Sequence, residues 1–295
     1  MDRDETRNLA LIPINQDFID VFETFMDDNQ RVKIRANNVR QYAEGIIDLL
    51  LKDKIVAFLK PNENYDGVNW KRKIKIITQN YDENIGKNIQ EIFRVGGGGS
   101  HFKGKVNDDD LNDIINRAIH IVEDIFVKYF LESKHKFGSE NIFTIFSMLP
   151  LHNRIYILEN VSKHYTNKYI VDRLSLAYTK FGEKNKAITL IKNSLQENVI
   201  DESDYYLQLN RINNISLNLE ELYERNAHYE KNLGHSEAII VGNELIVGLP
   251  TSKDVFETAR AVQIFDDWFK TGKDKYPEFI NLFLYLMKTD DREYK

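Results

Sequence analysis

Residues 107–133 read NDDDLNDIINRAIHIVEDIFVKYFLES, and this stretch decides the fold class. Its apolar residues recur every three or four positions along one broad face, which is the pattern of a helix with one buried side. Asn107 suits the N-cap position, and the three aspartates after it fall in the first turn, where negative charge interacts favourably with the helix dipole. We therefore expect one long helix here, and the acidic triplet needs no metal ion to explain it.

The residues before this stretch predict a bundle of further helices. Apolar residues repeat at helical spacing in residues 17–29, 31–59, 68–82 and 85–95, with turn-forming residues in KPNENYDG between the second and third stretch. Lys71, Arg72 and Lys73 form a basic run within the third stretch. We interpret it as a solvated helix face, with the lining of a substrate path as the alternative. These patterns predict an all-α N-terminal domain over residues 1–135.

The second half of the chain, residues 136–295, predicts another helical domain. Residues 174–196, LSLAYTKFGEKNKAITLIKNSLQ, resemble one unit of the tetratricopeptide helix-turn-helix. The run AIIVGNELIVGLP has strand-like content, and a short β-hairpin near residues 238–249 is an alternative to helix there. The expected architecture is two all-α parts with at most one small hairpin.

The composition limits the classes of protein to consider. The chain has 295 residues with 42% hydrophobic content, which is enough for substantial cores, and a net charge of -6, which argues against a wholly basic nucleic-acid binder. It has no cysteine, so disulfides and thiolate zinc sites are excluded. No signal peptide or apolar run of membrane-spanning length is present, so we expect a soluble, cytoplasmic protein without a membrane contact.

A glycine run lies between two of the predicted helices, in EIFRVGGGGSHFKGK, residues 91–105. Arg94 precedes the four glycines and His101 follows them, so a turn made of glycine would bring the two side chains together and let a ligand approach the backbone. The run lacks the lysine and hydroxyl residue of a phosphate-binding loop, which disfavours nucleotide hydrolysis of that type. We expect a constrained turn that presents an arginine and a histidine.

Arg94 and His101, separated by six residues between two helices, resemble the arginine–histidine signature of the HEPN (higher eukaryote and prokaryote nucleotide-binding) superfamily. The resemblance covers roughly residues 18–132 and implies a metal-independent endoribonuclease that acts as a homodimer without a cofactor. Bacterial members often serve in phage defence or as growth-arresting toxins. Val95 departs from the pattern, since many members have a polar residue after the arginine.

The resemblance implies catalytic roles for Arg94 and His101. Histidine titrates near neutral pH and can move the proton of a ribose hydroxyl, while arginine presents a planar, permanently charged group to phosphate. One protomer supplies one such histidine, so a two-fold dimer would supply both a base and an acid. The residues expected to support catalysis or bind RNA are Ser100, Gly98, Gly99, Lys103, Lys105, Glu44 and Arg40.

Other interpretations remain open at the level of sequence. The domain with the HEPN-like pattern can be a noncatalytic module, and the whole chain can be a helical adaptor that binds proteins. GGGGS can also be a plain connection or an engineered linker. In the ribonuclease interpretation, the C-terminal domain regulates the enzyme or senses a protein trigger, and cleavage can stay latent until the trigger binds.

Overall fold

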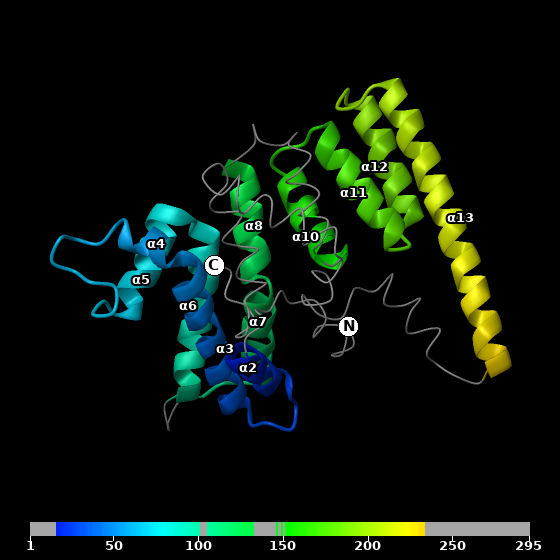
Figure 1. Cartoon of the computed structure of the whole chain (residues 1–295). Helices are drawn as coiled ribbons and strands as arrows, with labels where there is room; N and C mark the ends of the chain where they lie inside the picture. Colours follow the sequence, from blue (N-terminus) through cyan, green and yellow to red (C-terminus); the bar gives the residue numbers. More distant parts are fainter. Residues whose placement is uncertain (1–15, 101–104, 133–145, 147–148, 150, 234–295) are drawn as a thin grey trace, which may run out of the picture. The chain divides into compact units, whose positions relative to one another are not determined.

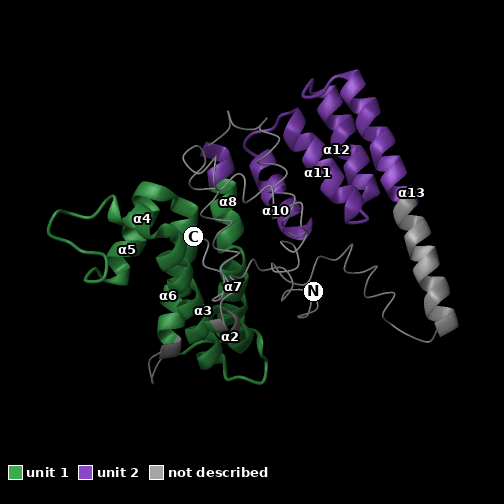
Figure 2. Ribbon diagram, viewed as in Figure 1, with its two compact units in different colours: residues 1–128, 273–295 green, residues 129–272 purple. Residues whose placement is uncertain are grey.

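The structure is a computed structural model that describes residues 16–100, 105–132, 146, 149 and 151–233 (Figure 1). These residues are mostly helical and contain no strand, so the predicted all-α fold is confirmed for this part of the chain. The predicted hairpin near 238–249 and the predicted domain boundary after residue 135 lie outside the described residues. The described chain divides into unit 1, up to Lys128, and unit 2, from Tyr129 (Figure 2).

Unit 1 is a helical bundle around an aromatic and aliphatic core. Its helices are α2 (Gln16–Met26), α3 (Val32–Ile46), α4 (Lys52–Val56), α5 (Trp70–Ile76), α6 (Glu83–Ser100), α7 (Asp108–Ile119) and the first two turns of α8 (Ile121–Glu132). Helix α3 packs against α2, α6 and α7. Phe22, Phe25 and Tyr42 meet edge to face or tilted between α2 and α3, with ring centroids 4.9–6.1 Å apart.

Two of the predicted helices contain a π-helical turn. The predicted helix over residues 31–59 is α3 followed by η1 (Ile47–Leu51) and α4, and the predicted helix over residues 68–82 is α5 followed by η2 (Ile77–Tyr81). Lys73 lies in α5 and is buried. Its Nζ sits 3.6 Å from the centre of the Tyr65 ring and 4.2 Å from that of Trp70, so the interpretation of this lysine as part of a solvated face is wrong.

The helix predicted over residues 107–133 is two helices. The Asn107 cap is confirmed, because its side chain accepts a hydrogen bond from the Asp110 N–H at 2.7 Å. Helix α7 ends at Ile119. His120 follows as its C-cap with a φ of -100° and a ψ of 0°, and α8 starts at the next residue. The side chain of Glu123, buried in the first turn of α8, lies 3.2 Å from the His120 ring, so a local polar contact accompanies the break.

Unit 2 continues from the end of α8 into a series of antiparallel helices. They are α10 (Leu151–Ser162), α11 (Lys168–Lys180), α12 (Lys184–Gln196) and α13 (Glu202–Leu233). Helices α11 and α12 form the helix-turn-helix that residues 174–196 predict. Gly182 makes the turn with a φ of 85°, a conformation that glycine adopts without a steric penalty. Ile170, Leu174, Ala187 and Ile191 are buried in this unit.

Candidate functional site

All four glycines of the run lie in α6, which extends to Ser100. The predicted glycine turn is therefore wrong for residues 96–100, and the connection to α7 comes after them. Packing explains the helix. A Cβ at Gly96 would lie 2.6 Å from Arg40 Cβ and 2.8 Å from the Ala36 carbonyl oxygen, so only glycine lets α6 come this close to α3. Tertiary contact overrides the low helix propensity of glycine here.

Arg40 and Glu44, which we predicted as supporting residues, lie on α3 beside the glycine run. Arg40 Nε donates to Glu44 Oε1 at 2.8 Å, and the guanidinium lies over the Phe93 ring at 5.1 Å from its centre. Arg40 Nη1 is 3.8 Å from the position that a Cβ at Gly97 would occupy. The Arg40–Glu44 ion pair on α3 therefore lies beside Phe93 and Gly97 of α6.

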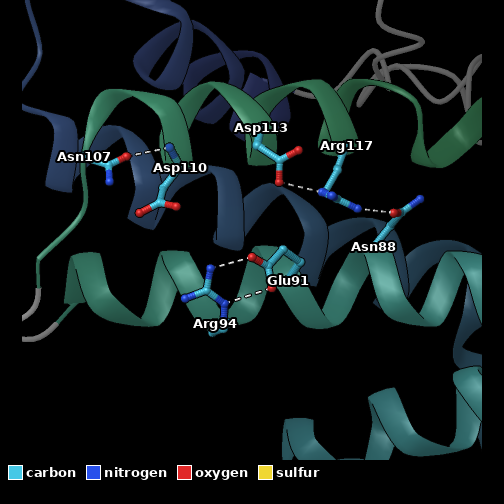
Figure 3. A network of polar contacts seen from close by, with 7 residues as sticks. All are labelled: Asn88, Glu91, Arg94, Asn107, Asp110, Asp113 and Arg117. Atoms are coloured by element: carbon cyan, nitrogen blue, oxygen red, sulfur yellow. Dashed lines mark hydrogen bonds and ion pairs between the residues drawn. The ribbon is translucent and has the colours of Figure 1, made fainter.

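Arg94 lies on α6 next to the glycines, with 62% of its side chain exposed. It makes a two-point contact with Glu91 on the same helix, with Nε 2.8 Å from Oε2 and Nη2 2.5 Å from Oε1 (Figure 3). The hydrogen bond to Glu91 and the charge of that carboxylate raise the pKa of Arg94, while the same hydrogen bond lowers the pKa of Glu91. The pair is therefore fully charged over the physiological pH range.

Helix α7 adds a second set of charged side chains beside Arg94. Arg117 Nε donates to Asp113 at 2.8 Å, and Arg117 Nη1 reaches from α7 to Asn88 on α6 at 2.6 Å (Figure 3). Asp110 and Asp113 also contribute to the raised pKa of Arg94. Sequence analysis missed these residues, although the spacing of Glu91 to Arg94 and of Asp113 to Arg117 is that of helical ion pairs.

The remaining predicted site residues fall around the end of α6. The Lys105 carbonyl oxygen and the Val106 side chain lie 3.6 Å and 3.5 Å from the position of a Cβ at Gly98, so the chain returns past this glycine before α7 begins. Gly99 and Ser100 complete the backbone of α6. His101 and Lys103 lie outside the described residues. The structure therefore places Arg94 but does not describe its predicted catalytic partner.

Comparisons with models of protein families, with curated protein sequences and with solved structures returned no match for this chain. In the part of the chain that the structure describes, no helix is long and apolar enough to cross a membrane. Within the same residues, no group of three or more histidine or carboxylate side chains is arranged to hold a metal ion.

His120, at the junction of α7 and α8, gives the bundle a pH-dependent contribution to stability. Burial acts to lower its pKa, but the hydrogen bond to Glu123 and the charge of that residue outweigh burial, so the pKa is raised above its ordinary value of 6.5. A raised pKa in the folded state means that the contribution is complete below pH 6.5 and is lost as pH rises through the folded-state pKa.

We therefore expect His120→Gln to lower the free energy of unfolding of unit 1 more at pH 6 than at pH 9. Urea denaturation of both proteins at the two pH values measures this difference. Equal effects of the substitution at pH 6 and pH 9 would show that the charged form of His120 is not stabilised by Glu123.

Proposed function

We propose that unit 1 is a metal-independent endoribonuclease of the HEPN type, in which Arg94 binds the scissile phosphate and His101 transfers protons. The exposed position of Arg94 carries the proposal. Its guanidinium is held near the end of α6 by one carboxylate on the same surface, and His101 follows the last residue of that helix in the chain. An exposed ion pair contributes at most about 1 kcal/mol to stability. A phosphate group of RNA can therefore replace Glu91 as the partner of Arg94 with little loss of free energy.

In the proposed reaction the ribose 2′-oxygen forms a bond to phosphorus as the bond from phosphorus to the 5′-oxygen breaks. A histidine takes the proton of the 2′-hydroxyl, and an acid gives a proton to the leaving 5′-oxygen. The products are a 2′,3′-cyclic phosphate and a 5′-hydroxyl. Arg94 stabilises the negative charge that develops on the phosphoryl oxygens, as planar guanidinium groups do at phosphate sites.

The proposal includes a homodimer, because one protomer supplies one histidine of this signature. A second copy related by two-fold symmetry would contribute the other His101 and a second Arg94, so that one histidine acts as base and the other as acid. Lys105, Lys103 and the backbone near Gly98 and Ser100 would then contact the RNA backbone. Arg40 and Glu44, beside Phe93 and Gly97 of α6, would hold the helix end in place. Unit 2 would regulate the activity or bind a trigger.

The test is cleavage of single-stranded RNA by the purified chain in the presence of EDTA. We expect fragments with 2′,3′-cyclic phosphate ends, and we expect His101→Ala to lower the cleavage rate by about 100-fold or more, the typical contribution of general acid–base catalysis. Circular dichroism checks that the variant is folded. Light scattering measures the oligomeric state, for which we expect a dimer.

The alternative function is a noncatalytic helical adaptor, and one observation favours it. Helix α13 exposes Tyr206, Leu207 and Leu217, with 65%, 59% and 55% of their surface accessible, beside a tetratricopeptide-like hairpin. Intact RNA with the wild type, together with no growth arrest on expression, would support the adaptor and contradict the ribonuclease. Intact RNA in the purified assay with growth arrest that depends on His101 would indicate a latent ribonuclease that needs a trigger.

A further inference from the structure

Unit 1 carries a basic segment that has no role in the proposed cleavage step. Residues 48–81 contain seven lysine and arginine residues and four carboxylates, which gives them a net charge of +3 in a chain of net charge -6. Residues 57–69 of this segment connect α4 to α5 as a loop that projects from the bundle (Figure 1). Connections of this length without a helix or strand of their own are uncommon in compact domains, and the ordered ones are usually functional. The charge and the loop together favour a surface for an anionic partner.

The loop is anchored to α5. Tyr65, within the loop, is buried, and the centre of its ring lies 3.6 Å from Lys73 Nζ. Glu63 Oε2 accepts a hydrogen bond from the Lys60 N–H at 2.9 Å and lies 3.5 Å from Arg72 Nη2. These contacts hold the backbone of Lys60 beside Arg72 of α5.

Three cations of this segment remain exposed beside the anchored loop. The other two cations of α5, Arg72 and Lys73, each lie close to a carboxylate. Lys60, Lys71 and Lys75 are exposed and form no ion pair with any residue that the structure describes. Lys71 and Lys75 are four residues apart, so they lie on the same side of α5, one turn apart. The outer side of α5 therefore presents positive charge that the fold itself does not neutralise.

The same loop also presents an exposed aromatic ring. Phe58 lies two residues after the end of α4 and two residues before Lys60, with 47% of its surface accessible. Proteins that bind single-stranded nucleic acid combine cations, which contact the phosphates, with aromatic rings, on which bases stack. We call Phe58, Lys60, Lys71 and Lys75 the α4–α5 face.

Helix α5 links this face to the helix that carries Arg94. Trp70, at the start of α5, packs on Phe93 of α6 with ring centroids 5.2 Å apart. Lys71 follows Trp70 in the chain, and Arg94 follows Phe93. The α4–α5 face thus begins next to α6 rather than in a separate part of the molecule.

We propose that the α4–α5 face binds single-stranded RNA away from the scissile phosphate. Lys60, Lys71 and Lys75 contact phosphates of the strand, and one base stacks on Phe58. The choice of RNA as the anionic partner rests on the proposed function. The face adds a binding surface to unit 1 and takes no part in proton transfer.

The experiment measures the binding of a fluorescein-labelled single-stranded RNA by fluorescence anisotropy at several sodium chloride concentrations. The full-length chain carries His101→Ala, so that bound RNA stays intact. Each phosphate contact on a single strand contributes about 0.7 to the slope of log affinity against log salt. Lys71→Gln combined with Lys75→Gln is therefore expected to reduce this slope by about 1.4. A rise in salt of about four-fold then costs the His101→Ala parent about seven-fold more affinity than the variant.

Phe58→Ala tests the stacking contact separately. It is expected to weaken binding by about 5-fold or more, the lower end of what one stacked base contributes, and to leave the salt slope unchanged. Lys87→Gln combined with Lys192→Gln is the matched control, because it removes the same charge from exposed lysines on α6 and α12. Without a phosphate contact to lose, this control is expected to bind RNA within about two-fold of the parent. Circular dichroism checks that each variant is folded.

Absence of RNA binding by the parent, or an unchanged salt slope for the folded Lys71→Gln, Lys75→Gln variant, would overturn the proposal. An equal change of slope in the control would overturn it too. Binding to vesicles that contain phosphatidylserine, lost in the Lys71→Gln, Lys75→Gln variant while RNA binding is retained, would assign the face to a membrane surface instead. The expected binding effects without RNA cleavage by the wild type would contradict the ribonuclease but support the α4–α5 face, so the two failures are distinguishable.

Discussion

Gly96→Ala is expected to lower the free energy of unfolding of unit 1 by about 1–3 kcal/mol, the usual cost of overpacking a well-packed site. The added methyl group would lie 2.6 Å from Arg40 Cβ and 2.8 Å from the Ala36 carbonyl oxygen. Both contacts involve atoms on or next to the backbone of α3, so a change of side-chain rotamer cannot remove them. The helices must separate, and the contacts between α3 and α6 weaken along their length.

Gly97→Ala is the matched control, because it makes the same chemical change at the next residue. A Cβ there meets only Arg40 Nη1, at 3.8 Å, so alanine is expected to stabilise the helix by about 0.5–1 kcal/mol through its higher propensity. Urea denaturation followed by Trp70 fluorescence measures both effects, since Trp70 packs on Phe93 of α6 and a Trp268→Phe background removes the other tryptophan. Stabilisation by both substitutions would contradict the helical packing of the glycine run.

Arg35→Met is expected to lower the free energy of unfolding of unit 1 by about 2–3 kcal/mol, the range for lost hydrogen bonds of a charged group. Arg35 is buried in α3. Its Nε donates to the Phe25 carbonyl oxygen in the last turn of α2 at 2.8 Å, and its Nη1 lies 2.8 Å from Asp28. The side chain therefore caps the C-terminal end of α2, where a positive charge is favourable.

Arg31→Met is the control for this substitution. Arg31 is exposed just before α3 and makes no side-chain capping bond, so its loss is expected to change the free energy by no more than about 0.5 kcal/mol. The same fluorescence measurement applies to both variants. Similar stabilities of Arg31→Met and Arg35→Met would show that Arg35 does not cap α2.

The sequence was sufficient to predict the helices because their evidence is local. Apolar spacing predicted α2, α3, α6 and the α11–α12 hairpin, and Asn107 was identified as an N-cap from its residue type and position. The structure places Arg40 and Glu44 beside the glycine run, and their expected supporting role stays a prediction. The predictions of the helices and of the Asn107 cap need only residues within one or two helical turns, or the general rule that an apolar face is buried.

The errors concern contacts and breaks that apolar spacing and residue type do not reveal. Four glycines have a low helix propensity, and residue type alone does not reveal that Ala36 and Arg40 on α3 approach Gly96 of α6 so closely. The break at His120 leaves the apolar pattern uninterrupted, so periodicity alone cannot detect it. The burial of Lys73 against Tyr65 and Trp70 likewise requires the packed structure, since a basic run on a helix is usually solvated.

The initial rate of RNA cleavage in EDTA by Arg94→Ala, compared with Lys87→Ala, tests the proposed function most directly. Lys87 lies on the same helix, pairs with Glu83 at 2.6 Å and has 62% of its side chain exposed, the same fraction as Arg94. We predict a loss of about 100-fold or more for Arg94→Ala, as for other groups that stabilise developing charge, and a rate within about two-fold of the wild type for Lys87→Ala. Equal cleavage rates for the two variants would contradict the proposed ribonuclease function. The absence of cleavage by the wild type, together with the absence of growth arrest that depends on His101, would contradict it as well.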